Sequence, residues 1–387
     1  MKKLAIITTH PIQYNAPLFA LLSKRGVVEP KVFYTWGKSV LNDKFDPGFG
    51  KTIKWDIPLL TGYEYTFVNN LASKPGSHHF LGIDNPTLVK EITEWGADAI
   101  LVFGWAFKSH LRAMRYFKGK IPVLFRGDST ILDPYGIVKH FARSMLLRWV
   151  YRYIDIALYV GKANKQYFLV NKVSLNKLVH APHSIDNERF HLKPEYFEKA
   201  QELKKELNLP NEAVVFLFAA KFEEKKDPIQ LIRAFKLVKH PNCHLVMIGN
   251  GPLEDLVYGE AKGDSRIHFL PFQNQSMMPV IYHLGDIYVL PSLGPETWGL
   301  AVNEAMAAGK AVLVSNTCGC AEDLVREGEN GYIFQSGNFE DLRKHLQIVA
   351  DNHTRLAEMG KRSLEIIKDF NFEKICEVIE NVTNASK

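Results

Sequence analysis

Short runs of uninterrupted apolar residues recur along this chain, and segments with helical spacing separate them. The first half contains LAIITT, KVFYTW, AILVFG, PVLFRG and IALYV, and the second half contains VVFLFAA, HLVMIG, IHFLPF, IYVLPS, AVLVSN and GYIF. A strand that is apolar throughout, rather than at alternate positions, is covered on both faces, as in a parallel sheet between two layers of helices. The pattern therefore predicts an α/β protein in which each half is a Rossmann-like, doubly wound domain.

The 387 residues leave room for two domains of ordinary size. We expect residues 1–195 to form the first domain and residues 196–369 the second. The final segment, 370–387, has the apolar spacing of an amphipathic helix and no strand after it, which predicts that it packs back on the first domain. Two such domains would face each other across a cleft lined by the carboxyl ends of their strands, where open α/β sheets bind ligands.

The composition favours a globular protein, with 46% hydrophobic and 23% charged residues. No apolar run approaches the roughly 20 residues that span a bilayer. The four cysteines, Cys243, Cys318, Cys320 and Cys376, lack the spacing of a metal site. The Cys-Gly-Cys pair could be redox-active or bind a metal, but reduced thiols are the simpler interpretation, and we expect a cytoplasmic location.

Two glutamates, Glu296 and Glu304, flank Gly299 in the stretch PETWGLAVNEAMAAG, which leads from a buried strand into a helix. The first N–H groups of a helix have no partner within it and carry about half a positive charge, so they suit a diphosphate. With a sugar nucleotide at this end, one carboxylate could accept hydrogen bonds from ribose hydroxyls and the other from sugar hydroxyls. Alternatively, Glu304 is a solvated helix residue and Glu296 is an acidic residue favoured by the helix dipole.

Three blocks of the second half resemble the family 4 glycosyltransferases, which are retaining enzymes of the GT-B fold that use nucleotide sugars. The two glutamates, with seven residues between them, match the signature of that family. The block LFAAKFEEKKDPIQLIRAF resembles its phosphate-contacting basic pair, at Lys221 and Lys226, although the family usually has arginine at the first position. The block HLVMIGNGPLEDL resembles its glycine loop, with Gly249 and Gly251.

The resemblance implies two groups of site residues. The group that would act on the reacting sugar and the leaving diphosphate is Glu296, Lys226, Lys221 and Arg126. The group that would bind the donor is Gly249, Gly251, Trp298, Gly299, Leu300 and Glu304. The alternatives remain open: the two lysines could belong to the solvated charge run that we expect for Glu223, Glu224 and Lys225, and the glycines could form an ordinary turn.

The loop THPIQYNAPLF follows the first strand, where related family members have a loop that faces the acceptor or a phosphate. The usual pair of glycines is absent, and His10, Gln13 and Tyr14 stand there instead. We assign these three residues to the acceptor side. His10, beside a proline, could equally be a turn residue.

Three further residues of the first half follow predicted strands or lie near the predicted hinge. Arg126 stands where many family members have a cleft histidine, and it could contact the diphosphate or the acceptor, or form a salt bridge with Asp128. Trp105 could shape the acceptor site or belong to the core. His183, in the segment HAPHSIDNERF, could contact a ligand on the acceptor side or close the first domain.

These features predict a retaining glycosyltransferase that moves a sugar from a nucleotide diphosphate to a hydroxyl group, as in the synthesis of cell-surface polysaccharide or glycolipid. We expect a UDP-sugar rather than a GDP-sugar, no cofactor, and no metal ion, because basic side chains and helix amides would balance the charge of the diphosphate. The alternatives are a sugar-nucleotide epimerase or a phosphorylase of the same fold, a transferase that modifies DNA, and a two-lobed solute-binding protein.

The charge is unequal along the chain, since residues 1–200 contain 28 basic and 16 acidic side chains while residues 201–387 contain 20 and 26. Residues 139–153, in the basic half, place Phe141, Met145, Leu146 and Trp149 on one side of a predicted helix, with cationic residues nearby. Such a helix could lie on an anionic membrane surface and bring the enzyme to a lipid-linked acceptor. It could equally face the core with a solvated basic rim, and nucleic acid is a weaker candidate because no aromatic-interleaved basic motif is present.

Overall fold

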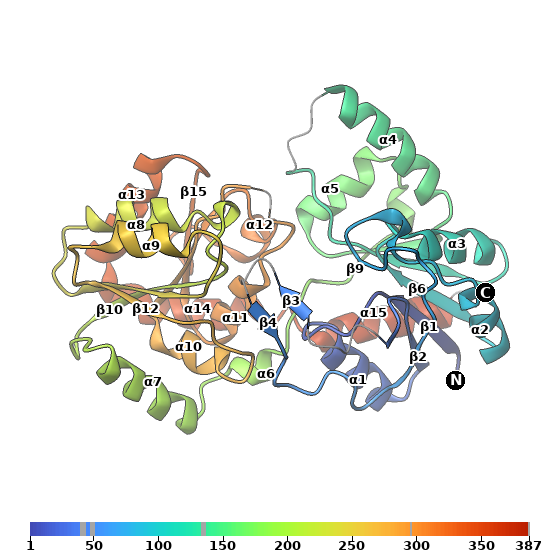
Figure 1. Cartoon of the computed structure of the whole chain (residues 1–387), viewed down its shortest axis with the longest axis horizontal. Helices are drawn as coiled ribbons and strands as arrows, with labels where there is room; N and C mark the ends of the chain where they lie inside the picture. The colour runs from blue at the N-terminus through green and yellow to red at the C-terminus, as the bar shows by residue number, and fades with distance from the viewer. Residues whose placement is uncertain (39–43, 47–50, 133–136, 295, 386–387) are drawn as a thin grey trace. The chain divides into compact units, whose positions relative to one another are not determined.

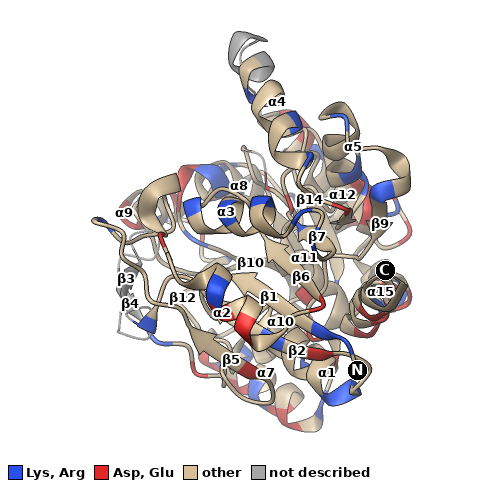
Figure 2. Cartoon of the chain, turned by 90° about the vertical axis from the view of Figure 1, so that its right-hand side faces the viewer, with Lys and Arg blue, Asp and Glu red and all other residues tan. Residues whose placement is uncertain are grey.

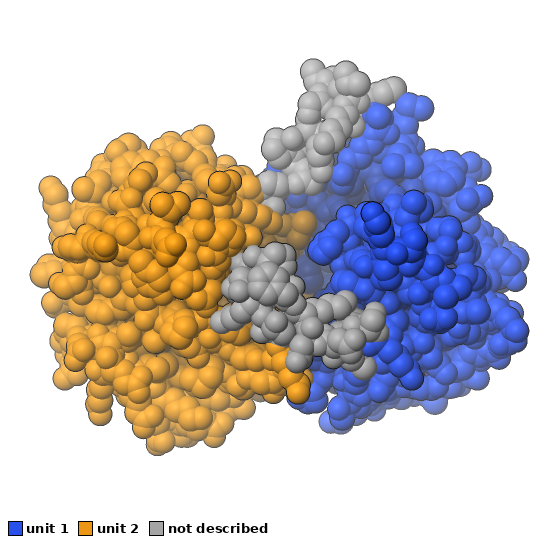
Figure 3. Space-filling model, in the orientation of Figure 1, with its two compact units in different colours: residues 1–44, 58–183, 372–387 blue, residues 45–57, 184–371 orange. Residues whose placement is uncertain are grey.

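The computed structural model describes residues 1–38, 44–46, 51–132, 137–294 and 296–385, and their side chains except at 44–46, 51–53 and 137–141. The chain forms two compact units (Figure 3). The first unit comprises Met1–Lys44, Pro58–His183 and Phe372–Lys387, and the second comprises Phe45–Ile57 and Ser184–Asn371.

The first unit is built on a seven-stranded sheet in which all neighbouring strands are parallel (Figure 1). In spatial order the strands are β5 (Glu64–Phe67), β2 (Glu29–Tyr34), β1 (Lys3–Thr8), β6 (Ala99–Phe103), β7 (Val123–Arg126), β8 (Ile156–Tyr159) and β9 (Leu178–His180). In β1, Ala5 and Ile7 face one core while Leu4 and Ile6 face the other, and all four are fully buried. Burial on both faces explains the continuous apolar runs and confirms the predicted fold class for this unit.

Helices cover both faces of this sheet. One core includes side chains of α2 (Leu88–Trp95), α3 (Lys108–Phe117), α4 (Ile137–Tyr151) and α5 (Lys162–Val170). The other includes side chains of α1 (Ala16–Arg25) and of the C-terminal helix α15 (Phe372–Ala385). Two hydrogen bonds from the Arg25 guanidinium to the Glu380 carboxylate, at 2.7 and 2.9 Å, join α1 to α15. The last segment of the chain is therefore part of the first unit.

The second unit has a six-stranded sheet, again parallel between all neighbours. Its strands, in spatial order, are β12 (Ile267–Leu270), β11 (Cys243–Ile248), β10 (Val214–Ala219), β13 (Ile287–Leu290), β14 (Ala311–Ser315) and β15 (Gly331–Phe334). The strand order reverses between β10 and β13, and ligands of open α/β sheets bind beyond the carboxyl ends of the strands at such a point.

The helices of the second unit also lie on both faces of its sheet. The core on one face includes side chains of α8 (Pro228–Lys236), α9 (Glu254–Ala261) and α13 (Phe339–Asp351). The other helices are α6 (Asn187–Phe190), α7 (Pro194–Glu206), α10 (Met278–Leu284), α11 (Leu300–Ala307), α12 (Ala321–Leu324) and α14 (Leu356–Ile367). The smaller elements of the chain are the paired strands β3 (Lys44–Asp46) and β4 (Lys51–Ile53) and the 3-10 turns η2 (Phe80–Gly82), η3 (Leu175–Lys177), η4 (Glu224–Lys226) and η5 (His353–Arg355).

The units divide at His183 and Ser184 rather than after residue 195. The reason is α6, whose Phe190 carbonyl oxygen lies 3.0 Å from Nε2 of His283 on α10. Residues 45–57 also belong to the second unit, where the carbonyl of Lys54 accepts a hydrogen bond of 2.7 Å from Asn274. Neither contact follows from hydrophobic periodicity, because both are polar and join residues far apart in the sequence.

Candidate functional site

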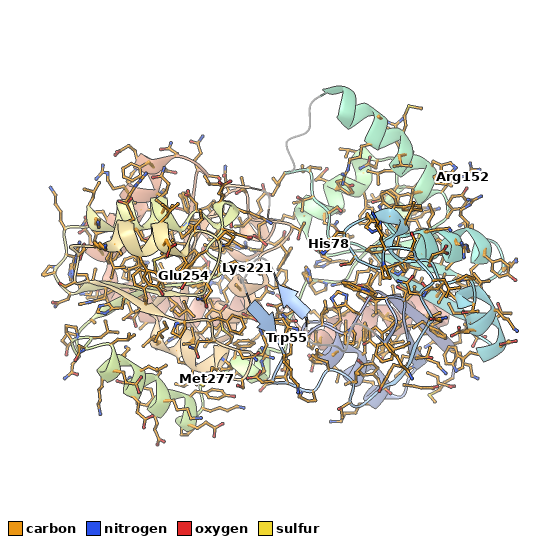
Figure 4. All side chains as sticks on the ribbon, in the orientation of Figure 1. Trp55, His78, Arg152, Lys221, Glu254 and Met277 are labelled. Atoms are coloured by element: carbon orange, nitrogen blue, oxygen red, sulfur yellow. The ribbon has the colours of Figure 1, made fainter. Side chains whose placement is uncertain are left out.

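The carboxyl end of β10 leads to the basic block of the second unit. Lys221 is half-buried and follows β10 by two residues, as labelled in Figure 4. Lys225 and Lys226 then lie in the 3-10 turn η4, and Asp227 adopts left-handed backbone angles before α8 begins at Pro228. Burial raises the pKa of Asp227 to about 6. The turn thus places two lysines in succession beside a strand end.

Glu296 lies between the ammonium groups of these two lysines. Its Oε2 accepts a hydrogen bond from Nζ of Lys226 and lies 3.5 Å from Nζ of Lys225. The side chains of Lys226 and Glu296 are each 16% exposed, while that of Lys225 is 42% exposed. We call these three residues the lysine–glutamate cluster. Lys225 is exposed, as expected for a solvated charge run, and its ammonium also lies within ion-pair distance of Glu296.

Glu304 is placed differently from Glu296. Gly299, with left-handed backbone angles, is the N-cap of α11, and Glu304 is the fifth residue of that helix. Its side chain is buried, and Oε2 accepts a hydrogen bond of 2.8 Å from the hydroxyl of Tyr282 on α10. Glu304 is not a solvated helix residue, so that alternative is excluded. Tyr282, which holds this carboxylate, was not singled out in the sequence because a tyrosine in an apolar run has no distinguishing signal.

Trp298 supports the loop between the two glutamates from within the protein. Its side chain is 2% exposed, and Nε1 donates a hydrogen bond of 2.7 Å to the side chain of the buried Asn303. Its carbonyl oxygen accepts a hydrogen bond of 3.0 Å from N–H of Cys320. The indole therefore fixes the start of α11. The neighbouring Leu300, the first residue of α11, is half-buried.

The Cys-Gly-Cys segment forms the other side of this loop. N–H of Gly319 donates to the carbonyl of Glu296 at 2.9 Å, and a Cβ atom at Gly319 would lie 2.1 Å from the carbonyl oxygen of Thr297. Both cysteines are buried, and burial raises the pKa of the Cys318 thiol to about 11. The segment is thus a close-packed support for Glu296. Within the described residues, no group of three or more histidine, cysteine or acidic side chains is arranged to hold a metal ion.

Gly249 and Gly251 follow β11 and allow two loops of the second unit to touch. A Cβ atom at Gly249 would lie 2.1 Å from the carbonyl oxygen of Ala220, and one at Gly251 would lie 2.5 Å from that of Phe222. Hydrogen bonds from N–H of Phe222 to Asn250 and from N–H of Leu253 to Phe222 close this contact. The two glycines hold the loop after β11 against the segment that contains Lys221.

Arg126 ends β7 in the first unit and is buried. Its guanidinium donates hydrogen bonds of 2.8 and 3.0 Å to the carbonyl oxygens of Ala181 and Pro182, just after β9. Burial lowers its pKa to about 10, which the negative charge of Asp128 partly offsets. These contacts make Arg126 an anchor for the end of the sheet. Its predicted contact with a diphosphate or an acceptor stays a prediction.

The remaining predicted site residues of the first unit differ in burial and in the groups that they contact. His183 is half-buried, and burial lowers its pKa to about 4. Trp105 packs at the margin of the core, which agrees with the alternative that assigns it to the core. His10 lies with Nδ1 2.8 Å from the hydroxyl of Thr9 and its ring edge-on to Trp36, at 5.2 Å between centroids. Gln13 and Tyr14 are half-buried in the turn before α1.

Sequence reasoning missed a buried polar network at the strand ends of the first unit. His110 on α3 is fully buried, with Nδ1 2.8 Å from the carbonyl oxygen of Gly104 and Nε2 2.9 Å from the hydroxyl of Thr35. Burial lowers the pKa of His110 to about 4, so the ring is neutral. Asn85 donates to the carbonyls of Thr35 and Asn69, both at 2.9 Å. The network ties together the ends of β2, β5 and β6.

The predicted basic amphipathic helix is α4, and its apolar side is exposed. The side chains of Phe141 and Lys139 lie outside the described residues, but Met145, Leu146 and Trp149 are 56%, 46% and 37% exposed. The core is instead contacted by other residues of the helix, namely Leu147, Val150 and Tyr151. The helix therefore faces the core, as the alternative expectation has it, but through residues other than Met145, Leu146 and Trp149. Among the described residues, no helix is both long enough and apolar enough to cross a membrane.

Comparison with known proteins finds a family match within the second unit. Residues 199–365 match the model of the family described as glycosyl transferases group 1. This stretch, which is less than half of the chain, is therefore similar to the glycosyl transferases group 1. The match contains the lysine–glutamate cluster, Glu304 and both glycines that follow β11.

Two curated relatives and one solved structure extend this result. An uncharacterized glycosyltransferase of Haemophilus influenzae is 30% identical over 142 residues, which are 36% of this chain and 39% of that protein. A lipopolysaccharide 1,2-N-acetylglucosaminetransferase of Salmonella typhimurium is 30% identical over 191 residues, 44% of this chain and 47% of that protein. The match thus spans less than half the length of either relative. HepE of Anabaena in complex with UDP is 17% identical, with a TM-score of 0.72 over 100% of both chains, which establishes a shared fold.

Proposed function

We propose that this protein is a retaining glycosyltransferase that transfers a sugar from a UDP-sugar to a hydroxyl acceptor. The observation that carries the proposal is the lysine–glutamate cluster beside the N-terminus of α11, with Glu304 buried in the same helix. This arrangement offers cationic groups and helix amides to a diphosphate, and carboxylates to hydroxyl groups on both sides of it. The match of residues 199–365 to the glycosyl transferases group 1 supports the same proposal.

The proposed roles follow from the charges and positions of the residues. Lys221, Lys226 and the first amides of α11 stabilise the diphosphate, whose negative charge increases as the glycosidic bond to it breaks. Glu304, held by Tyr282, accepts hydrogen bonds from the ribose. Glu296 accepts hydrogen bonds from the transferred sugar. The departing phosphate oxygen takes the proton of the acceptor hydroxyl on the same face of the sugar, which gives retention.

The choice of UDP and of the acceptor is supported by the relatives. HepE has been solved with UDP and with UDP-glucose, and the Salmonella typhimurium relative is named for lipopolysaccharide and N-acetylglucosamine. We therefore propose a UDP-sugar as donor and a saccharide or lipid-linked saccharide of the cell surface as acceptor, with the reaction in the cytoplasm or at the inner face of the membrane.

The test is a product assay with UDP-glucose, UDP-N-acetylglucosamine and GDP-mannose, each labelled in the sugar, with and without cell-envelope lipid extract. Acceptor-dependent release of UDP together with a labelled glycan supports the proposal. A new sugar nucleotide without acceptor would indicate an epimerase, and a requirement for inorganic phosphate would indicate a phosphorylase. Labelled DNA would indicate a DNA-modifying transferase, and binding without turnover would indicate a solute-binding protein.

A peripheral contact of α4 with anionic lipid belongs to this proposal. The exposed Met145, Leu146 and Trp149 are accompanied by Arg148 on α4 and Arg152 just after it, which are also exposed. Figure 2 shows lysine and arginine residues in blue along α4. Arg115 of α3 lies 5.6 Å from the centre of the Trp149 ring. Apolar side chains ringed by cations suit the interface of an anionic bilayer, where each cation contributes about 1 kcal/mol.

The membrane contact is tested by sedimentation with vesicles that contain or lack anionic lipid. Arg148→Gln with Arg152→Gln should weaken binding to anionic vesicles, and added salt should do the same. Arg143 is unsuitable for this test, because its guanidinium is 3.3 Å from the hydroxyl of Tyr167 rather than in solvent. Lys344→Gln, at an exposed position of α13 in the second unit, is the matched control. Equal binding to neutral and anionic vesicles, or none, would favour a soluble acceptor.

A further inference from the structure

One oxygen of Glu296 interacts with two consecutive lysines. Oε2 is hydrogen-bonded to Nζ of Lys226 and lies 3.5 Å from Nζ of Lys225. The main chain fixes this arrangement, because N–H of Leu293 donates to the carbonyl of Lys225 at 2.9 Å and joins η4 to the loop after β13. A second hydrogen bond, of 3.1 Å from N–H of Glu296 to Thr317, holds the other side of that loop. The carboxylate and both ammonium groups are therefore held close together by their backbones.

This geometry creates a competition if the proposed function is correct, and the inference rests on that function. Lys226 is the lysine assigned to the diphosphate, yet its ammonium already neutralises Glu296. A diphosphate that approaches Lys226 also approaches the Glu296 carboxylate, and like charges at such distances repel. Donor binding must therefore draw Lys226 away from Glu296, which would leave this largely buried carboxylate in need of another cation.

We propose that Lys225 is a positioning residue that takes over the carboxylate of Glu296 when the diphosphate of the donor draws Lys226 away. In the protein without donor, the Glu296 carboxylate is paired with the Lys226 ammonium, and this pairing reduces the affinity for the diphosphate. In the donor complex, Lys225 balances the charge of Glu296 and keeps the carboxylate directed at the sugar. Its greater exposure leaves its long side chain room to make the short displacement that direct contact requires.

The test is a double-mutant cycle on UDP binding, measured by isothermal titration calorimetry with Lys225→Met, Glu296→Gln and the combination. Lys225→Met should weaken UDP binding about three- to fivefold, as for a partly exposed ion pair. Glu296→Gln should strengthen UDP binding by a similar factor, because Lys226 is released. In the Glu296→Gln background, Lys225→Met should change affinity by less than about twofold, since a residue that acts through Glu296 has no effect without it.

Three further variants test whether the effect on UDP affinity depends on the charge of Lys225 and on its position. Lys225→Arg should keep wild-type affinity, since it keeps the cation. Lys226→Met should weaken UDP binding in both backgrounds, because Lys226 contacts the phosphate directly. Lys344→Met, on the exposed side of α13, should change nothing. Thermal unfolding of each variant, followed by circular dichroism, separates loss of binding from loss of the fold.

The results that would overturn the inference differ from those that would overturn the function. Equal weakening by Lys225→Met in both backgrounds would make Lys225 a phosphate ligand, and weaker UDP binding by Glu296→Gln would exclude the competition; either result overturns the inference alone. Absence of UDP binding by the wild-type protein, in a preparation that transfers no sugar, would overturn the proposed function and the inference with it.

Discussion

The strand ends of the two units carry polar side chains that bind different kinds of partner. In the second unit, Glu296 is partly exposed and pairs with the side chains of Lys225 and Lys226. In the first unit, Arg126 and His110 are buried and bond to carbonyl groups of their own main chain. An ion pair between side chains can open to a ligand that offers a similar charge. A buried group that moves away from carbonyl oxygens leaves them without hydrogen bonds, which costs about 1–3 kcal/mol for each.

A polar residue at a strand end is therefore not by itself a site residue. Arg126 ends β7, His110 lies on the helix after β6, and Glu296 lies in the loop after β13. The rule that ligands bind at the carboxyl ends of parallel strands does not separate these three residues. The kind of partner does separate them, because ionic side-chain partners can be exchanged whereas main-chain partners belong to the fold. We therefore expect substitutions in the second unit to change activity and those in the first unit to change stability.

The largest effect is expected for Glu296→Ala. Transfer should fall about 10²- to 10³-fold, the usual loss when one group that stabilises a transition state is removed. The thermal midpoint should fall only slightly, because Lys225 and Lys226 both keep some contact with water once the carboxylate is removed. The matched control is Glu224→Ala, at an exposed position in the same 3-10 turn as the two lysines. Wild-type transfer by the folded Glu296→Ala protein would remove Glu296 from the site.

The converse result is expected for Arg126→Met in the first unit. Loss of the hydrogen bonds to Ala181 and Pro182 should lower the free energy of unfolding by about 2–4 kcal/mol, measured by urea denaturation. Affinity for UDP should stay at the wild-type value. Arg112→Met, which removes an exposed pair with Asp84, should cost less than about 1 kcal/mol. A stable Arg126→Met protein that has lost transfer would assign Arg126 to catalysis and break the comparison.

The pH dependence of the free energy of unfolding should distinguish the buried histidine network from the exposed ion pairs. The pKa of His110 is about 4 in the folded protein because burial disfavours the charged ring, against 6.5 when the ring is solvated. Below pH 6.5 the unfolded chain therefore binds a proton that the folded protein does not, and stability falls with pH until about 4. This difference amounts to roughly 2 kcal/mol between pH 6.5 and 5.

The measurement is the free energy of unfolding at pH 7 and pH 5 for the wild type, His110→Asn and the control His78→Asn. The pH-dependent loss should be smaller in His110→Asn, which has no group that titrates there. It should be unchanged in His78→Asn, because that histidine is exposed. If His110→Asn shows the full wild-type loss, His110 does not carry the pH dependence.

The sequence predicted those features that depend on local pattern. Continuous apolar runs predicted two parallel sheets because burial on both faces leaves that mark in each strand. The spacing of the glutamate motif correctly put Glu296 before Gly299 and Glu304 inside the helix that follows. The resemblance pointed to the family 4 glycosyltransferases, and residues 199–365 match the glycosyl transferases group 1, which agrees with that resemblance at the level of a glycosyltransferase.

The sequence could not predict which distant residues meet. The hydrogen bonds of Arg126 to the carbonyl groups of Ala181 and Pro182 were not predicted, because nothing local shows that these groups lie within its reach. The hydrogen bond from the buried Trp298 indole to Asn303 was not predicted either, and the donor contact of Trp298 stays a prediction. Lys225 is exposed as predicted, but the charge run in the sequence does not reveal that η4 turns its ammonium towards Glu296. Each of these outcomes depends on tertiary contacts rather than on periodicity.

The smallest effect, none at all, is expected for removal of divalent metal ions. Lys221, Lys226 and the amides of α11 are proposed to neutralise the diphosphate, while Glu296 is paired with lysines and Glu304 accepts from Tyr282. Magnesium usually reaches a nucleotide through one or two carboxylates of the protein, and here the carboxylates already have other partners. Transfer should therefore be unchanged by excess EDTA and not stimulated by manganese. Loss of transfer in EDTA that manganese restores would show that a metal ion neutralises the diphosphate. The lysines of the second unit would then not be sufficient for that role.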